Sequence, residues 1–65
     1  MLLWVVYLSI YEDDGLLGVF DNQQAAHAAA VGAWRWIEVW TLNGPKTAQC
    51  YYLSPDGRQS DWAPR

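Results

Sequence analysis

Three sets of side chains in this sequence have the chemical types that catalysis or metal binding requires. The first is the run Glu12, Asp13 and Asp14, whose carboxylates suit a hard cation such as Mg²⁺ or Ca²⁺. The run lacks the ligand spacing of a calcium-binding loop. We interpret it as a charged turn between two strands, with Gly15 supplying the positive φ angle that tight turns need. We therefore expect no metal site and no cofactor.

The other two sets are single residues, His27 and Cys50. A catalytic histidine needs a nucleophile and an orienting acid, and no sequence pattern supplies them for His27. A reactive cysteine needs a neighbouring positive charge that lowers its pKa, and none lies beside Cys50. We interpret His27 as a packed or surface residue and Cys50 as a small apolar residue facing inward. The sequence predicts no catalytic residue, and we expect that the protein is not an enzyme.

Large aromatic residues recur at the spacing of β-strands. Trp36 and Trp40 have the same parity, and Tyr7 and Tyr11 share parity in another segment. Because alternate residues of a strand point to one face, this spacing predicts an aromatic face on one side of a sheet. The alternative is that the rings form the core of a rolled sheet. The residues predicted to form an interaction site are Tyr7, Tyr11, Trp36, Glu38, Trp40 and Tyr51.

Alternating apolar residues and turn residues predict a hairpin that positions the first of these rings. Residues 3–11 form its first strand, with the even-numbered side chains facing the core. Residues 16–20 form its second strand. A two- or four-residue loop would place Leu17 and Val19 on the core face, which is the arrangement we prefer. A three-residue loop would place Phe20 there instead.

An alanine-rich helix is predicted over residues 23–31, because alanine is the best helix former and lets a helix lie close to a sheet. Asp21 and Gln24 have the spacing of a capping box, so we expect Asp21 to cap the first turn. Gly32 is well placed just past the helix end. A helix of this length depends on packing against the sheet for its stability.

Glu38 determines the orientation of the strand predicted over residues 34–42. A lone carboxylate is rarely buried without a partner. We therefore expect Glu38 and the two tryptophans of the same parity to lie on an open face. Ile37 and Val39 then lie under the helix.

The last predicted strand covers residues 46–53, with Ala48 facing inward and Tyr51 outward. Together the elements predict a small α+β domain in the order ββαββ. Its antiparallel sheet has one helix on one face and an aromatic-rich opposite face. The domain spans residues 1–57, and residues 58–65 form a polar C-terminal tail. One helix cannot cover both faces of such a sheet, so we expect the second face to be open or shared.

Composition narrows the classes of partner. The 65 residues carry a formal net charge of −3, and their four basic residues are scattered, which argues against nucleic-acid binding. The apolar N-terminal segment has no basic flank and is too short to span a membrane. A single cysteine without a signal peptide favours the cytoplasm. A domain this small is marginal alone, and five tryptophans favour dense packing or a homo-oligomer.

Five segments carry a resemblance: Val5-Val6-Tyr7, Tyr11, Gly15-Leu16-Leu17-Gly18-Val19-Phe20-Asp21, Ala25-Ala26 and Ile37-Glu38-Val39-Trp40. They resemble a group of small uncharacterised phage and bacterial proteins in which a strand, an acidic loop and a second strand precede a capped helix. The resemblance implies a phage or mobile-element accessory protein, and it implies no activity or site. If a phage encodes the chain, the expected cytoplasm is that of the host cell. The chain differs from the group in its shorter helix, its longer second hairpin and its many tryptophans.

Two function hypotheses follow. The first is a non-catalytic protein that acts through protein–protein interaction, by self-association, by inhibition of a host or defence protein, or by both. The alternative is a protein that binds and sequesters a small ligand such as a nucleotide in a pocket at a dimer interface, with aromatic rings stacking on the base. The absence of a glycine-rich phosphate-binding loop argues against the second hypothesis.

Overall fold

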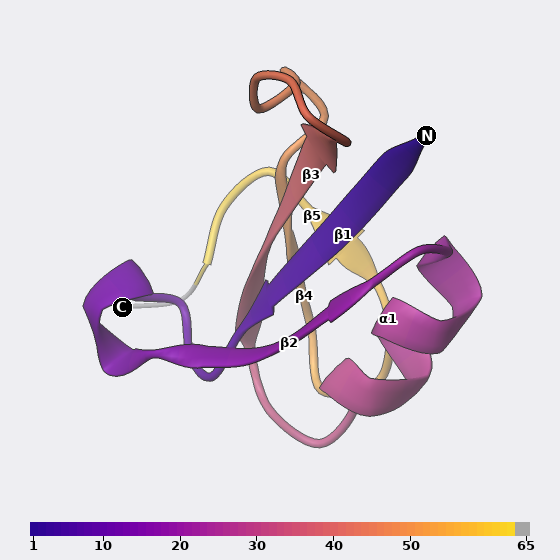
Figure 1. The fold of residues 1–65 in the computed structure, drawn as a ribbon. Helices are drawn as coiled ribbons and strands as arrows, with labels where there is room; N and C mark the ends of the chain where they lie inside the picture. Colours follow the sequence, from indigo (N-terminus) through magenta and orange to yellow (C-terminus); the bar gives the residue numbers. More distant parts are fainter. Residues whose placement is uncertain (64–65) are drawn as a thin grey trace.

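The computed structural model describes residues 1–63, in which one helix packs on one face of a five-stranded antiparallel sheet (Figure 1). The strands lie in the order β2-β1-β3-β4-β5 across the sheet, and every neighbouring pair of strands is antiparallel. The predicted α+β class is confirmed. The strands are β1 (Leu2–Tyr7), β2 (Leu16–Phe20), β3 (Arg35–Thr41), β4 (Tyr51–Leu53) and β5 (Gln59–Ser60), joined by the helix α1 (Gln23–Ala30) and the 3₁₀ turn η1 (Glu12–Asp14).

Strand β5 lies within the segment predicted as a polar tail. Leu53 of β4 pairs with Gln59, and Tyr52 pairs with Ser60. The chain reverses at Gly57, whose φ angle is +91°. This short hairpin extends the sheet by one strand at the β4 edge. Residues 64 and 65 of the predicted tail lie outside the described residues.

The core forms between the helix and the alternate side chains of β1, β3 and β4. Val6, Ile37 and Leu53 are fully buried there, and Val39 is nearly so. The helix contributes Ala26 and Ala30 to the same cluster. Figure 1 shows the helix beside β1 and β2, the two strands whose contacts with it are most extensive. The prediction that Ile37 and Val39 lie under the helix is confirmed.

The helix begins at Gln23, as predicted, but its cap residue differs from the prediction. Asn22, in an extended conformation, caps it by accepting a hydrogen bond from the Ala25 backbone N–H at 2.8 Å. Asp21 accepts a hydrogen bond from the Asn22 side chain instead. The prediction of an Asp21 cap was wrong because both residues favour N-cap positions and the adjacent asparagine takes it. Gly32 follows the helix with a φ angle of +99°, as expected for a residue past the helix end.

The register of β2 contains a bulge that changes which side chains reach the core. Val6 pairs with Gly18 and Tyr7 pairs with Leu16, so the intervening Leu17 has no partner residue on β1. The bulge shifts parity by one residue. Phe20 therefore packs against the core together with Leu17, while Val19 is exposed on the other face. The preferred placement of Val19 on the core face was wrong, and the alternative placement of Phe20 is the observed one.

The segment before β4 is irregular, which corrects the predicted last strand. The Thr47 hydroxyl accepts a hydrogen bond from the Gln49 backbone N–H, and this local turn interrupts the alternation of side chains. Tyr51 then pairs with Ile37 and is buried on the helix side. Its predicted outward orientation was wrong, as was the inward orientation of Ala48, which is exposed. Tyr52 takes the outward position and pairs with Trp36.

Strand β1 ends at Tyr7, four residues before its predicted end, because the chain bends at Leu8. The Arg35 guanidinium holds this bend by donating a 2.6 Å hydrogen bond to the Leu8 carbonyl. The same guanidinium donates to the carbonyl of Ala30 in the last turn of the helix, at 2.8 Å. The prediction that Leu8 faces the core was wrong, since its side chain is exposed.

Replacing Gly15 with valine is expected to lower the free energy of unfolding by about 1–3 kcal/mol. Gly15 has a φ angle of +104° and a ψ angle of 170°, a conformation that is almost exclusive to glycine. An added Cβ would meet Leu8 at an ordinary 3.5 Å, so the loss comes from backbone strain. Urea denaturation measures it. Asp13→Ala, in the same turn, is the control and should shift the midpoint little, whereas equal losses would contradict this account.

Candidate functional site

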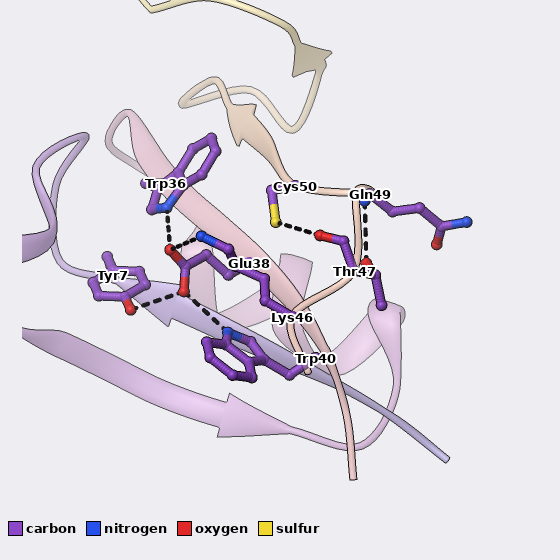
Figure 2. A network of polar contacts seen from close by, with 8 residues as sticks. All are labelled: Tyr7, Trp36, Glu38, Trp40, Lys46, Thr47, Gln49 and Cys50. Carbon is purple, nitrogen blue, oxygen red and sulfur yellow. Dashed lines mark hydrogen bonds and ion pairs between the residues drawn. The ribbon is translucent and has the colours of Figure 1, made fainter. Parts of the chain in front are cut away.

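Glu38 lies at the centre of the sheet face opposite the helix, and it is 2% exposed. Four side chains surround its carboxylate (Figure 2). Oε1 accepts hydrogen bonds of 3.0 Å from the Tyr7 hydroxyl and from the Trp40 indole N–H. Oε2 accepts one of 2.9 Å from the Trp36 indole N–H and lies 3.6 Å from Lys46 Nζ. These contacts tie together β1, β3 and the loop that follows β3.

The strands explain why these groups meet. Trp36 and Trp40 flank Glu38 at two-residue spacing, so all three side chains leave β3 on the same side. Tyr7 lies on the neighbouring strand β1, with the same parity as Val5, the residue that pairs directly with Glu38. A hairpin turn after β3 brings the next segment back, and an isolated bridge to Trp40 places Lys46 over the carboxylate.

These contacts hold the carboxylate in its charged form. Burial alone would raise the pKa of Glu38, but the hydrogen bonds from Trp36, Trp40 and Tyr7 and the nearby Lys46 charge outweigh burial and lower it. Burial, the hydrogen bond to Glu38 and the charge of Glu38 raise the pKa of Tyr7 to about 12. Tyr7 is therefore a hydrogen-bond donor at neutral pH. A carboxylate whose neighbours are all donors, and whose pKa is lowered, is a poor general acid or base near pH 7.

The arrangement fixes the aromatic rings. The polar edges of both indoles point at Glu38, so their hydrogen-bonding needs are met within the chain. The Tyr52 ring packs on Trp36 with a centroid separation of 4.7 Å. No helix among residues 1–63 lies on this side of the sheet. We call it the uncovered face, and by strand register it comprises Leu3, Val5, Tyr7, Leu16, Val19, Trp36, Glu38, Trp40, Tyr52 and Ser60.

The sheet brings together four of the six predicted site residues, Tyr7, Trp36, Glu38 and Trp40. Tyr11 is apart from them, exposed in the loop before η1. Tyr51 lies on the opposite face, under the helix. The predicted site residues included neither Tyr52 nor Lys46. Two signals in the sequence could have found them. Adjacent strand residues point to opposite faces, so one ring of the tyrosine pair at 51 and 52 had to face outward. A glutamate on a strand favours a basic residue opposite it on the neighbouring segment, as Lys46 is here.

A second polar cluster lies on the helix side of the sheet. The Tyr51 hydroxyl is within hydrogen-bonding distance of His27 Nε2 and accepts a 3.3 Å hydrogen bond from the Gln23 amide. Burial lowers the pKa of His27, so the ring is neutral at physiological pH. Burial also raises the pKa of Tyr51. Neither group has an acid partner that would make the histidine a base for a nucleophile. The cluster anchors the helix to β4.

Among residues 1–63, no three His, Cys, Asp or Glu side chains gather so that they could hold a metal ion. No helix in that part of the chain has the length and hydropathy needed to cross a membrane. No family model, characterised protein or solved structure significantly matches the chain. The resemblance to phage accessory proteins stays a prediction, and function is inferred from the chain's own side chains.

Proposed function

We propose that this protein is a non-catalytic interaction protein that associates with a second copy of itself through the uncovered face. The observation that supports this function is the internal neutralisation of Glu38 by two indoles, a phenol and Lys46. Glu38 is the one charged residue among the strand positions of that face. Apart from Lys46, whose side chain is 44% exposed over the carboxylate, the face is apolar and aromatic toward solvent. Tyrosine and tryptophan dominate the binding energy of protein interfaces because they bring large area with few rotatable bonds.

Two features of the uncovered face favour a second copy of the chain as its partner. In a two-fold dimer each face meets itself, so a bare carboxylate at its centre would repel its symmetry mate. Here Glu38 is 2% exposed and Lys46 offsets its charge, which removes that repulsion. A stable dimer buries about 800 Å² per partner. That area is roughly a fifth of the 4204 Å² accessible surface of the chain, about twice the roughly 10% that a small protein commits to a standard interface.

The edge of the uncovered face gives the sharpest test. Val19 of β2 is 52% exposed on this face, and Val31, just past the helix, is 55% exposed away from it. We expect Val19→Lys to weaken dimerisation at least about tenfold, because a lysine would be desolvated in an apolar interface. The matched control Val31→Lys makes the same change at the same exposure and should leave the dimer intact. Sedimentation velocity measures both.

Circular dichroism separates this effect from unfolding, since both variants should keep the spectrum of the unmodified chain. Equal dissociation constants for Val19→Lys and Val31→Lys would contradict use of the uncovered face. A host or defence protein as the only partner would leave the purified chain monomeric and both variants unchanged in mass. That result would contradict self-association and favour binding to a host or defence protein.

A further inference from the structure

A hollow of about 580 Å³ lies where the loop before η1 meets the chain that follows β5. In Figure 1 the yellow chain after β5 leads toward the η1 turn, in agreement with the residues that line the hollow. Its volume is within the range of about 300–1,000 Å³ found for small-molecule sites. Its lining residues are Ile10, Tyr11, Tyr52, Asp61, Trp62 and Ala63.

Three of these six residues are aromatic, and the only charged one is Asp61. The face of an aromatic ring carries negative potential, and it attracts cations within about 6 Å, most strongly for tryptophan. A carboxylate beside such rings adds direct attraction for the same ligands. The hollow therefore combines two features that select a positively charged organic group, and its apolar remainder suits alkyl substituents.

Acidic residues adjoin the lining residues of the hollow in sequence. The acidic turn Glu12–Asp14 directly follows Tyr11. Among residues 1–63, the basic side chains each have a partner within the chain. Arg35 binds backbone carbonyls, Lys46 lies on Glu38, and Arg58 is paired with Asp56. A concave site surrounded by one sign of charge raises the local concentration of ligands of opposite charge.

Local hydrogen bonds hold the backbone that carries the rings. The Ser60 hydroxyl accepts from the Trp62 backbone N–H at 3.2 Å and donates to the Trp62 carbonyl at 2.6 Å. The Ser9 hydroxyl likewise accepts from the Tyr11 backbone N–H at 3.0 Å. Packing on Trp36 restrains the third ring, that of Tyr52. Such preorganisation reduces the entropy lost on binding.

We propose that this hollow binds a small organic cation of the quaternary ammonium class. The rings contact the alkyl groups around the charged nitrogen, and Asp61 supplies the counter-charge. This binding site is separate from the proposed self-association. It also changes the small-ligand hypothesis in two ways: the site lies within one chain and not between two, and the ligand is a cation and not a nucleotide.

Choline is the probe, and 3,3-dimethyl-1-butanol, which has the same shape without the charge, is the control ligand. Nitrogen-15 NMR titration follows the indole N–H signals of the five tryptophans. We expect choline to shift the Trp62 signal with a dissociation constant of about 1–10 mM, and the neutral control to bind at least about fivefold more weakly. Equal binding of the two ligands, or no shift with choline up to about 50 mM, would overturn the proposal.

Two variants test the residues. Trp62→Ala should abolish saturable binding, followed through the backbone N–H signals of the other lining residues because the variant lacks the Trp62 indole, and Asp61→Asn should weaken binding at least about threefold. Trp62 is 69% exposed, so its replacement should leave the circular dichroism spectrum unchanged. Asp21→Asn removes the same charge before the helix, at the other end of β2, and should leave choline affinity unchanged. If Asp61→Asn and Asp21→Asn behave alike, Asp61 is not the counter-charge and the assigned site is wrong.

Discussion

Replacing Glu38 with alanine is expected to lower the free energy of unfolding by about 3–5 kcal/mol, although no helix covers the face that Glu38 occupies. The substitution leaves the two indole N–H groups and the Tyr7 hydroxyl without their acceptor, and it removes the partner of Lys46. Removing one member of a buried charged network costs about 3–5 kcal/mol. A domain of this size has only about 3–10 kcal/mol of stability in total. Urea denaturation followed by circular dichroism measures the loss.

Glu38→Gln is the matched control, because it keeps the shape and one acceptor oxygen while removing the charge. Its loss should lie between those of the native chain and Glu38→Ala. The folded state lowers the pKa of Glu38, so the stabilisation is present above the ordinary glutamate pKa and is lost as the pH falls through the folded value. Stability should therefore decline below about pH 4.3 in the native chain, and less in Glu38→Gln. A Glu38→Ala chain within about 1 kcal/mol of the native stability would contradict this role.

Ile37→Ala and Trp40→Ala are expected to fail in different ways, although the two residues are close neighbours on β3. Ile37 is fully buried under the helix, and its truncation should lower the free energy of unfolding by about 2–5 kcal/mol. Trp40 is partly exposed on the uncovered face and donates a single hydrogen bond to Glu38, whose Oε1 keeps its bond from Tyr7. Its truncation should weaken self-association by about 2 kcal/mol or more, roughly thirtyfold, while the chain stays folded.

Denaturation curves and sedimentation velocity on both variants distinguish the two effects. A folded dimer for Trp40→Ala together with a folded, stable Ile37→Ala chain would mean that neither residue has the role assigned to it. An unfolded Trp40→Ala chain would place the ring in the folding core, and the uncovered face would then lose its main candidate for binding energy.

The features of the structure that were predictable from the sequence are the face on which β3 side chains lie and the backbone conformation of turn glycines. Glu38 was expected to share a side of β3 with Trp36 and Trp40, and this side placed Ile37 and Val39 in the core. Gly15 and Gly32 both have the positive φ angles that their turn positions suggested. These features depend on neighbours within a few residues, so a single sequence specifies them.

Features that depend on register between strands were not predictable. One extra residue in β2 moves Phe20 into the core, and a threonine-centred turn at residues 47–49 shifts the parity of Tyr51. The expectation that the Glu38 carboxylate would be exposed to solvent was also wrong. The carboxylate is on the expected side of the sheet but is buried, because Lys46 and Tyr7 reach it from segments distant in sequence. The meeting of these side chains at Glu38 depends on how all the strands are arranged, so local sequence patterns do not predict it.

Light scattering on the unmodified chain tests self-association through the uncovered face most directly. The chain mass is 7.4 kDa, and we expect a mass near twice this value, 14.8 kDa, at roughly 10–100 µM protein. Val19→Lys should lower the mass toward that of one chain under the same conditions, with an unchanged circular dichroism spectrum. A mass of 7.4 kDa for the unmodified chain across that range would contradict the proposed dimer.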